Sequence, residues 1–386
     1  MKIGFFNHSL RLGSGIDMVI TELASRLVNR KVDVTVFCFK TNYRREDYNF
    51  EIREINSSLA NSTPRMVLLA PFLIDKIGNL NSELEKYDVV NTHNFPANYI
   101  VRNIQKPFNV VTDWSVGDSK LWPSSLKQRL YVKWLVYRGN RIAARKADVV
   151  LVSSEFIRKW VRENYLIDPY YMMLNGINFE MLDRNKVSPS RVYQLYPEIE
   201  GKKIILFVGR MTDHKNIHSL IESFALVSKK DPDVKLLLVG DYDNYLGYYS
   251  VLKRLVKSRH VENNVIFTGV VPWDDLPSYY AASSIYATCT LWEGFLRAEY
   301  FAFARPIVCF DTGPNTETVK NGVNGFLIKD LNIVEFAEKM HILLTDSELA
   351  KQLGENGYAW ARKFLDFNLI SDEFKTFCEH RIASGR

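Results

Sequence analysis

The chain contains little cysteine and no long apolar run. Its four cysteines are far apart in the 386 residues and show no metal-ligand spacing, which argues against a disulfide framework and favours a reduced, cytoplasmic setting. The longest apolar stretch, at 66–74, has nine residues including a proline, whereas roughly 20 are needed to span a bilayer. Met1 leads directly into a strand-like segment, so no export signal is expected. These absences argue against a secreted disulfide-rich protein and against a membrane-spanning one.

The composition is that of a globular protein long enough for two domains. Of its residues 47% are hydrophobic and 24% are charged, and 386 residues exceed what one hydrophobic core usually contains. The net charge of +6 is unevenly distributed, because up to Glu180 there are 25 Lys and Arg against 18 Asp and Glu, and beyond it 25 against 26. The first half is therefore the basic half.

Strand-like apolar runs alternate with segments of helical periodicity along the chain. In the first half, the run at 2–7, the amphipathic segment at 16–30 and the run at 32–39 form a βαβ unit, which predicts a parallel sheet. The fold class is therefore α/β, with two doubly wound parallel sheets. Further strands, separated by helix-length segments, are expected in the second half at 203–208, 234–239, 264–268, 285–289, 306–310 and 325–328.

A stretch rich in proline and polar residues lies between the two halves. Asn175 and Gly176 follow the last strand of the first half, and the residues up to Glu200 include Pro189 and Pro197. We therefore expect a first domain at 1–180, a linker at 181–200, a second domain at 201–365 and a C-terminal helix at 366–386.

Two cations follow the first strand of the second domain. That strand ends at Gly209, and Arg210 and Lys215 come next in the segment VGRMTDHKN. Two acids follow a later strand: Glu293 stands on a loop, and Glu299 begins an apolar segment that should be helical. Because parallel strands place their carboxyl ends at one edge of a sheet, these charges should meet at one crevice. Cations together with acids that bind hydroxyl groups suit a ligand with phosphate and polyol parts, such as a nucleotide-sugar.

The first domain offers further candidates at the ends of its strands. The loop after the first strand carries Gly13 and Gly15, whose backbone amides and following helix N-terminus could accept a phosphate, although such glycines also serve turn geometry alone. Two later strands, at 88–96 and 108–115, should open on the same crevice, and near their ends stand His93, Asp113 and Trp114. A lone histidine at a strand end is also compatible with a purely structural role.

These motifs resemble those of the retaining glycosyltransferases of family 4, which have the GT-B fold. The likeness rests on Gly-Arg at 209–210 with Lys-Asn at 215–216, on Glu-Gly-Phe at 293–295 with the downstream Glu299, and on the Asn-Gly-Ile-Asn segment at 175–178. It extends over nearly the whole chain. It implies two Rossmann-like domains that face each other across a cleft, with the last helix crossing back to the first domain.

The resemblance also implies the chemistry. Such an enzyme moves a hexosyl group, without a protein nucleophile, from a UDP- or GDP-linked sugar to a lipid-linked or polysaccharide acceptor. Arg210 and Lys215 would hold the distal phosphate in place of a metal ion, Glu293 would contact sugar hydroxyls, and Glu299 the ribose. Neither a metal nor a cofactor is then expected. Further donor contacts would come from Gly15, Gly209, Val271, Gly294 and Phe295, and the acceptor-side groups would be His93, Asp113 and Trp114.

Two departures from the family pattern leave alternatives open. Five residues separate Glu293 from Glu299, two fewer than is usual in such enzymes, which bears on the sugar contacts of Glu293. Trp114 stands where the family often has a histidine close to the reacting sugar, so His93 or Asp113 would have to replace that histidine or its role would be absent. A nucleotide-sugar hydrolase or epimerase of the same fold, and a nucleotide-sugar-binding protein without turnover, are the competing interpretations.

A segment at 119–147 carries eight Lys or Arg and no acid, with aromatic and aliphatic residues between them. This pattern fits a surface that contacts anionic membrane head groups, and it equally fits a domain helix with a solvated basic face. A nucleic-acid partner is not expected, because no recognition motif accompanies the charges. The first interpretation predicts a cytoplasmic protein in peripheral contact with the inner face of the membrane.

Overall fold

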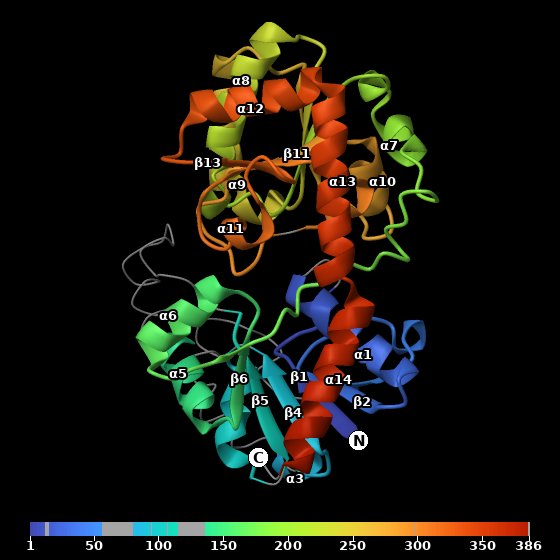
Figure 1. The fold of residues 1–386 in the computed structure, drawn as a ribbon, viewed down its shortest axis with the longest axis vertical. Helices are drawn as coiled ribbons and strands as arrows, with labels where there is room; N and C mark the ends of the chain where they lie inside the picture. Colours follow the sequence, from blue (N-terminus) through green and yellow to red (C-terminus); the bar gives the residue numbers. More distant parts are fainter. Residues whose placement is uncertain are drawn as a thin grey trace. The chain divides into compact units, whose positions relative to one another are not determined.

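A computed structural model of the chain describes residues 1–11, 15–55, 80–93, 95–105, 107–114, 136–296 and 298–384, apart from the side chain of Arg45. The chain forms two compact units, one of Met1–Gly176 with Leu365–Arg386 and one of Ile177–Phe364. Each unit is built around a parallel β-sheet with helices on its faces (Figure 1). The predicted fold class, two doubly wound α/β domains, is confirmed.

The first unit contains a seven-stranded sheet in the order β3-β2-β1-β4-β5-β6-β7, and every pair of neighbouring strands is parallel. Its strands are β1 (Lys2–Phe6), β2 (Asp33–Cys38), β3 (Glu51–Glu54), β4 (Val89–His93), β5 (Phe108–Thr112), β6 (Val149–Val152) and β7 (Tyr170–Tyr171). Its α-helices and 3-10 helices (η) are α1 (Gly15–Asn29), η1 (Arg45–Asp47), α3 (Leu80–Leu84), η3 (Ala97–Asn103), α5 (Tyr137–Lys146), α6 (Glu155–Tyr165) and α14 (Phe367–Ala383).

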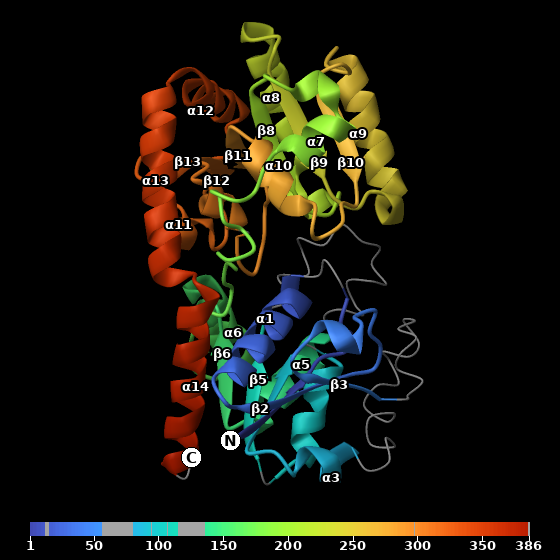
Figure 2. The same ribbon diagram turned by 90° about the vertical axis from the view of Figure 1, so that its right-hand side faces the viewer.

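Helices cover both faces of this sheet because its central strands are apolar on both sides. On one face α1 and the C-terminal α14 lie side by side (Figure 2). Their Val19 and Phe374 join the buried cluster around Phe5. On the other face, α5 and α6 supply Ala143 and Ile157 to a separate buried cluster. The C-terminal helix is thus part of the core of the first unit.

The second unit contains a six-stranded parallel sheet in the order β10-β9-β8-β11-β12-β13. Its strands are β8 (Ile204–Val208), β9 (Lys235–Val239), β10 (Val265–Gly269), β11 (Ile285–Thr288), β12 (Ile307–Phe310) and β13 (Gly325–Ile328). Its helical segments are α7 (Ser190–Leu195), η6 (Pro197–Ile199), η7 (Asp213–Lys215), α8 (Ile217–Lys230), η8 (Asp243–Tyr245), α9 (Leu246–Ser258), α10 (Leu276–Ala282), η9 (Glu299–Phe303), α11 (Asn315–Thr318), α12 (Ile333–Thr345) and α13 (Ser347–Phe364).

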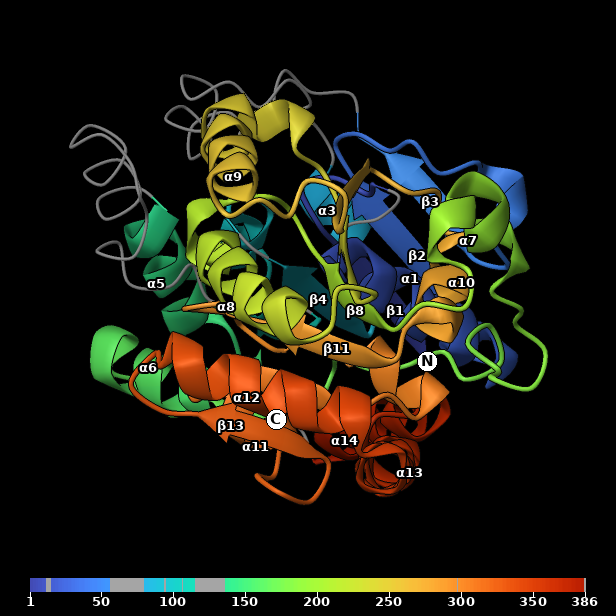
Figure 3. The ribbon, with the colours of Figure 1, turned by 90° about the horizontal axis from the view of Figure 1, so that it is seen from above.

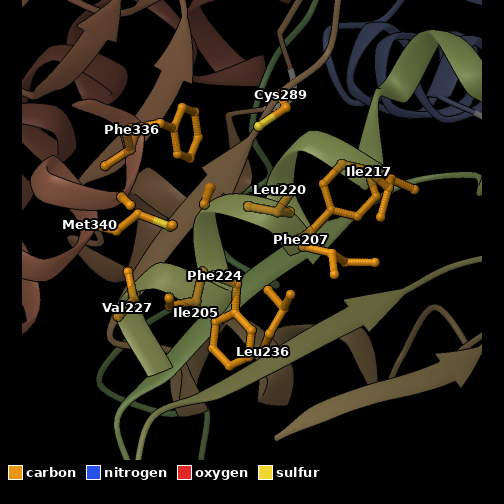
Figure 4. Packing of buried hydrophobic residues seen from close by; sticks show 14 of the residues in the cluster. Ile205, Phe207, Ile217, Leu220, Phe224, Val227, Leu236, Cys289, Phe336 and Met340 are labelled. Carbon is orange, nitrogen blue, oxygen red and sulfur yellow. The ribbon is translucent and has the colours of Figure 1, made fainter. Parts of the chain in front are cut away.

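One large cluster of buried side chains lies between the second sheet and the helices α8, α9 and α12. Phe207 and Leu236 of the strands pack there against Leu220 and Phe224 of α8, and Met340 of α12 completes the contact (Figure 4). α8 and α12 lie side by side over this face of the sheet (Figure 3). This packing holds β8, and therefore the loop that follows it, in a fixed place.

The segment 181–200, predicted to be a linker, is part of the second unit. Val192 and Ile199 are buried, and Arg191 forms an ion pair with Asp275 at 3.5 Å. The few apolar side chains of the segment give it a packing surface that its polar and proline-rich composition did not indicate. The second unit accordingly begins before this segment and not after it.

Candidate active site

The candidate site lies where the sheet of the second unit changes its direction of winding. From β8 the chain adds β9 and then β10 toward one edge of the sheet, whereas β11, β12 and β13 extend toward the other edge. β8 and β11 are neighbours, so the loops that follow them lead in opposite directions. In parallel α/β sheets, ligands bind at such a point, beyond the carboxyl ends of the strands. Arg210 follows β8, and Glu293 follows β11.

The backbone on both sides of Arg210 is held by neighbouring strand ends. Gly209 N donates to Val239 O at 2.8 Å, and Met211 N donates to Asp241 O at 2.8 Å. The two strand ends approach so closely that a Cβ on Gly240, whose φ is +141°, would lie 1.9 Å from the Gly209 carbonyl oxygen. Glycine is therefore required there. The side chain of Arg210 is exposed, and its Nη1 donates to the Tyr245 hydroxyl at 3.2 Å.

Lys215 ends the short helix η7 and is followed by a residue that turns the chain into α8. That residue, Asn216, has the left-handed φ of 52°, and its buried side chain accepts a hydrogen bond from Ser219 Oγ at 2.7 Å. A backbone hydrogen bond of 2.9 Å from Leu291 N to His214 O ties this turn to the loop after β11. The two loops that follow β8 and β11 are thus fastened together.

Lys215 and Glu293 form a direct ion pair between these two loops. Their side chains are only 13% and 24% exposed, so water screens the pair incompletely. Arg210 differs, since no carboxylate among the described residues forms an ion pair with its side chain. Among the described residues, an acid thus neutralises Lys215, and none does so for Arg210.

His214, which sequence analysis did not select, lies between the two cations in the chain. Burial, together with the charges of Lys215 and Arg210, lowers the pKa of His214 to about 3, so its imidazole is neutral at physiological pH. Its Nδ1 lies 3.1 Å from Thr212 Oγ1. The sequence did contain a signal for including His214 in the candidate site, because this histidine stands between an arginine and a lysine in one short loop.

The other predicted donor-binding residues stand beyond the carboxyl ends of strands in the same unit. Gly294 and Phe295 are partly exposed in the loop after β11, and Val271 is partly exposed in the loop after β10. Glu299 is buried as the first residue of η9, and its Oε2 accepts from Ala298 N at 3.0 Å. The apolar segment that Glu299 begins, predicted to be helical, is a five-residue 3-10 helix.

An acid that sequence analysis missed lies beside the loop expected to receive a phosphate in the first unit. Asp17, in the first turn of α1, accepts hydrogen bonds from Asn7 Nδ2 at 2.6 Å and from Arg11 N at 2.7 Å. Gly15 begins α1 and is exposed, and an added Cβ there would meet no atom within 4 Å, so packing does not require glycine. Gly13 lies outside the described residues. An acid just after a glycine loop is typical of a first helical turn, and this pattern could have identified Asp17 from the sequence.

The structure brings His93 and Trp114 together at the carboxyl ends of β4 and β5. Trp114 Nε1 donates to His93 Nδ1 at 3.0 Å, and the planes of the two rings differ by 16°. Burial lowers the pKa of His93 to about 3, so the ring is neutral and, with Nδ1 accepting, its hydrogen is on Nε2. That Nε2 is buried without a hydrogen-bond partner among the described residues. Asp113, also buried, raises the pKa of Tyr165 in addition to the effect of burial.

Residues 119–135 of the predicted basic surface lie outside the described residues, and most of the remainder forms α5. On this helix Arg138, Arg145 and Lys146 are exposed, whereas Ala143 is buried. α5 therefore has a core face and a solvated basic face. This arrangement agrees with a surface that contacts membrane head groups and equally with an ordinary domain helix. Within the part of the chain that the structure describes, no helix combines the length and the apolar character needed to cross a bilayer.

Among the described residues, no group of three or more His, Cys, Asp or Glu is placed to hold a metal ion. All four cysteines are described and buried, and no disulfide joins them.

Solved structures show which class the fold belongs to. Sucrose-phosphate synthase from Thermosynechococcus elongatus matches with a TM-score of 0.83 at 18% sequence identity, covering 100% of both chains. HepE of Anabaena, solved in complex with UDP and glucose, gives a TM-score of 0.77 at 20% identity and covers 98% of this chain and 99% of that chain. These similarities, with the two parallel sheets, define a GT-B fold.

Two family models match the sequence, one in each half. Residues 13–181 match the model described as Glycosyltransferase Family 4, and residues 195–360 match Glycosyl transferases group 1. The chain therefore belongs to the glycosyltransferases of group 1 and family 4, which confirms the family resemblance seen in its motifs.

Curated relatives agree with this assignment. The putative glycosyltransferase YtcC of Bacillus subtilis is 26% identical over 297 residues, which are 72% of this chain and 68% of that protein. CapM of Staphylococcus aureus, a capsular polysaccharide biosynthesis glycosyltransferase, is 26% identical over 261 residues, which are 63% of this chain and 64% of that protein. Nothing in these similarities supports a hydrolase, an epimerase or a binding protein without turnover.

Proposed function

We propose that this glycosyltransferase transfers a hexosyl group from a nucleotide-diphosphate sugar to a lipid-linked or polysaccharide acceptor, with retention of the anomeric configuration and without a metal ion. The observation that carries the proposal is the meeting of Lys215 and Glu293 at the switch point of the second sheet, with Arg210 on the same loop after β8 as Lys215. Phosphates require cations, and sugar hydroxyls require hydrogen-bond acceptors. Both kinds of group are present at this point.

The two cations have a direct role in the proposed reaction. Negative charge grows on the leaving diphosphate as the bond between the anomeric carbon and the phosphate breaks. Arg210 and Lys215 would bind this charge more strongly in the transition state than in the ground state, which lowers the barrier. Because they supply two positive charges, a metal ion is not required for this purpose.

Donor binding would exchange the partner of Lys215. In the donor-free protein its ammonium is paired with Glu293. An arriving phosphate takes over the ammonium, and the released carboxylate can accept hydrogen bonds from sugar hydroxyls. Glu299 is assigned to the ribose, and backbone and side-chain contacts to the donor are assigned to Gly15, Gly209, Val271, Gly294 and Phe295.

Retention is proposed to follow from attack on the face that the diphosphate leaves. The acceptor hydroxyl would approach on that face, and a phosphate oxygen would take its proton as the new glycosidic bond forms. No side chain then has to form a covalent bond to the sugar. The anomeric configuration of the product is the same as that of the donor.

A UDP-linked hexose is the first donor to test, and GDP-linked hexoses follow. The support is that HepE, which shares the fold, was solved with UDP and glucose. For the acceptor, the support is that the relative CapM is named for capsular polysaccharide biosynthesis. We assign His93, Asp113 and Trp114 to the acceptor side. His93 is a neutral hydrogen-bond donor at physiological pH, so it would orient an acceptor oxygen and would not remove its proton.

The test incubates the purified full chain with radiolabelled UDP-glucose or GDP-hexoses and a lipid extract or glycan acceptor. Transfer of label to the acceptor is expected, and NMR of the product should show the donor's anomeric configuration. Release of free sugar without transfer, or an inverted product, would contradict the proposal. Activity should survive EDTA, and its loss would contradict metal independence.

Peripheral contact with the inner face of the membrane is proposed for the basic segment at 119–147, supported by the exposed cations of α5. Lipid vesicles with anionic head groups should bind the protein at low salt and release it at high salt. Equal binding to neutral vesicles would count against this assignment.

A further inference from the structure

Arg210 has a partner that no motif of the sequence indicated. Its Nη1 donates to the hydroxyl of Tyr245 at 3.2 Å, although the two residues are 35 positions apart. A guanidinium has five N–H donors, so most of them remain for a ligand. A tyrosine hydroxyl that accepts one hydrogen bond still has its own hydrogen to donate.

The local structure holds Tyr245 firmly in this place. Tyr245 ends the short helix η8, and its N donates to Tyr242 O at 2.9 Å. The Asp241 carboxylate accepts from Asn244 N at 3.2 Å and from Asn244 Nδ2 at 2.7 Å. The ring of Tyr242 is stacked on that of Tyr249, with 4.3 Å between their centroids. These contacts preorganise the turn that presents the hydroxyl.

The same turn is also connected to the loop that carries Arg210. Asp241 O accepts the hydrogen bond from Met211 N, the residue directly after Arg210. A backbone hydrogen bond therefore joins the two loops from which the side chains of Arg210 and Tyr245 extend.

We propose that Tyr245 and Arg210 form one diphosphate-binding pair, in which the Tyr245 hydroxyl orients the guanidinium and donates its own hydrogen to a phosphate oxygen. The inference rests on the proposed function of the site. The Tyr245 hydroxyl adds a neutral hydrogen-bond donor to the two cations. It stands beside Arg210, with which no described carboxylate forms an ion pair. Lys215 must first leave Glu293, whereas Arg210 and Tyr245 already present donors that a phosphate can use at once.

The test compares Tyr245→Phe with Tyr249→Phe. Both remove one hydroxyl, and among the described residues the Tyr249 hydroxyl forms no hydrogen bond. Calorimetry measures the binding of UDP, GDP and uridine to the full chain. Tyr245→Phe is expected to weaken binding of the diphosphate about tenfold, as loss of a hydrogen bond to a charged group does, and to leave uridine binding unchanged. Tyr249→Phe should bind all three like the wild type.

Two further variants separate a role in phosphate binding from a role in folding. In an Arg210→Ala background, Tyr245→Phe should have a clearly smaller effect, because the two groups act as a unit. Tyr245→His retains a donor and should recover part of the lost affinity. Thermal melting checks that each variant is folded, and Tyr245 is partly exposed, so both replacements are compatible with the fold.

The outcomes distinguish this inference from the function on which it rests. If the wild type binds UDP or GDP and Tyr245→Phe binds it equally well, or loses uridine affinity to the same degree, the inference is overturned and the proposed function stands. If the wild type binds no nucleoside diphosphate at all, the proposed function is overturned as well.

Discussion

Replacing Glu293 by Gln removes the carboxylate that neutralises Lys215 in the donor-free protein. A nucleoside diphosphate must displace this carboxylate and is also repelled by it. A hydrogen bond between charged groups contributes about 1.5–3 kcal/mol, and the lower end applies because neither side chain is fully buried. We therefore expect Glu293→Gln to bind UDP more tightly by about 1.5 kcal/mol, which is about tenfold in Kd. Transfer should nevertheless fall by about 10-fold to 100-fold, because the sugar loses a charged hydrogen-bond acceptor.

The assay for this prediction is calorimetric titration with UDP, followed by the transfer assay on the same preparations. Asp213→Asn is the matched control. Asp213 lies on the same short helix as Lys215, is exposed, and forms no ion pair among the described residues, so its loss changes the net charge equally. Its UDP affinity should stay within twofold of the wild type. Unchanged or weaker UDP binding by Glu293→Gln would refute the idea that Glu293 and phosphate compete for Lys215.

The remaining predictions concern the cations, acid stability and a glycine. Arg210→Ala and Lys215→Ala should each reduce turnover on the order of 10²-fold in the transfer assay, and near-normal turnover in both would refute their role. Burial lowers the pKa of His93 to about 3, so below about pH 6.5 the unfolded chain binds a proton that the folded chain does not, and stability falls as the pH drops. Urea unfolding should show about 2 kcal/mol lost through this group between pH 7 and pH 5, and His93→Gln should reduce that loss; an equal loss in the variant would contradict the explanation. Gly240→Ala should destabilise by more than about 2 kcal/mol because its Cβ would lie 1.9 Å from a backbone carbonyl oxygen, whereas Gly247→Ala in α9, with no atom within 4 Å, should stabilise by about 0.5–1 kcal/mol. Equal melting temperatures for these two variants would show that the close approach is not rigid.

Most strands could be predicted from the sequence because their signal is local. The apolar run at 203–208 predicts a strand buried on both faces, and β8 is Ile204–Val208. β3 and β7 were missed, since they stand at the edges of the first sheet, are short and include exposed residues. The segment after Glu299 is too short for an α-helix, because Ala304 takes a left-handed conformation at its end.

The residue types of the candidate site could also be predicted, but not which of them meet. Apolar periodicity reports how each segment is buried, and it places Arg210 and Glu293 beyond strand ends. It does not report the order of the strands, and β8 is beside β11 although β9 and β10 separate them in the chain.

The sequence by itself determined the alternation of strands and helices, the two α/β domains and the family, because these depend on patterns within short segments and on motifs. Only the tertiary structure decided that Lys215 is paired with Glu293 and that Arg210 donates a hydrogen bond to Tyr245. The physical reason is that each of these contacts joins loops brought together by sheet order, and that order depends on side chains that pack across the whole unit, which no short segment reports.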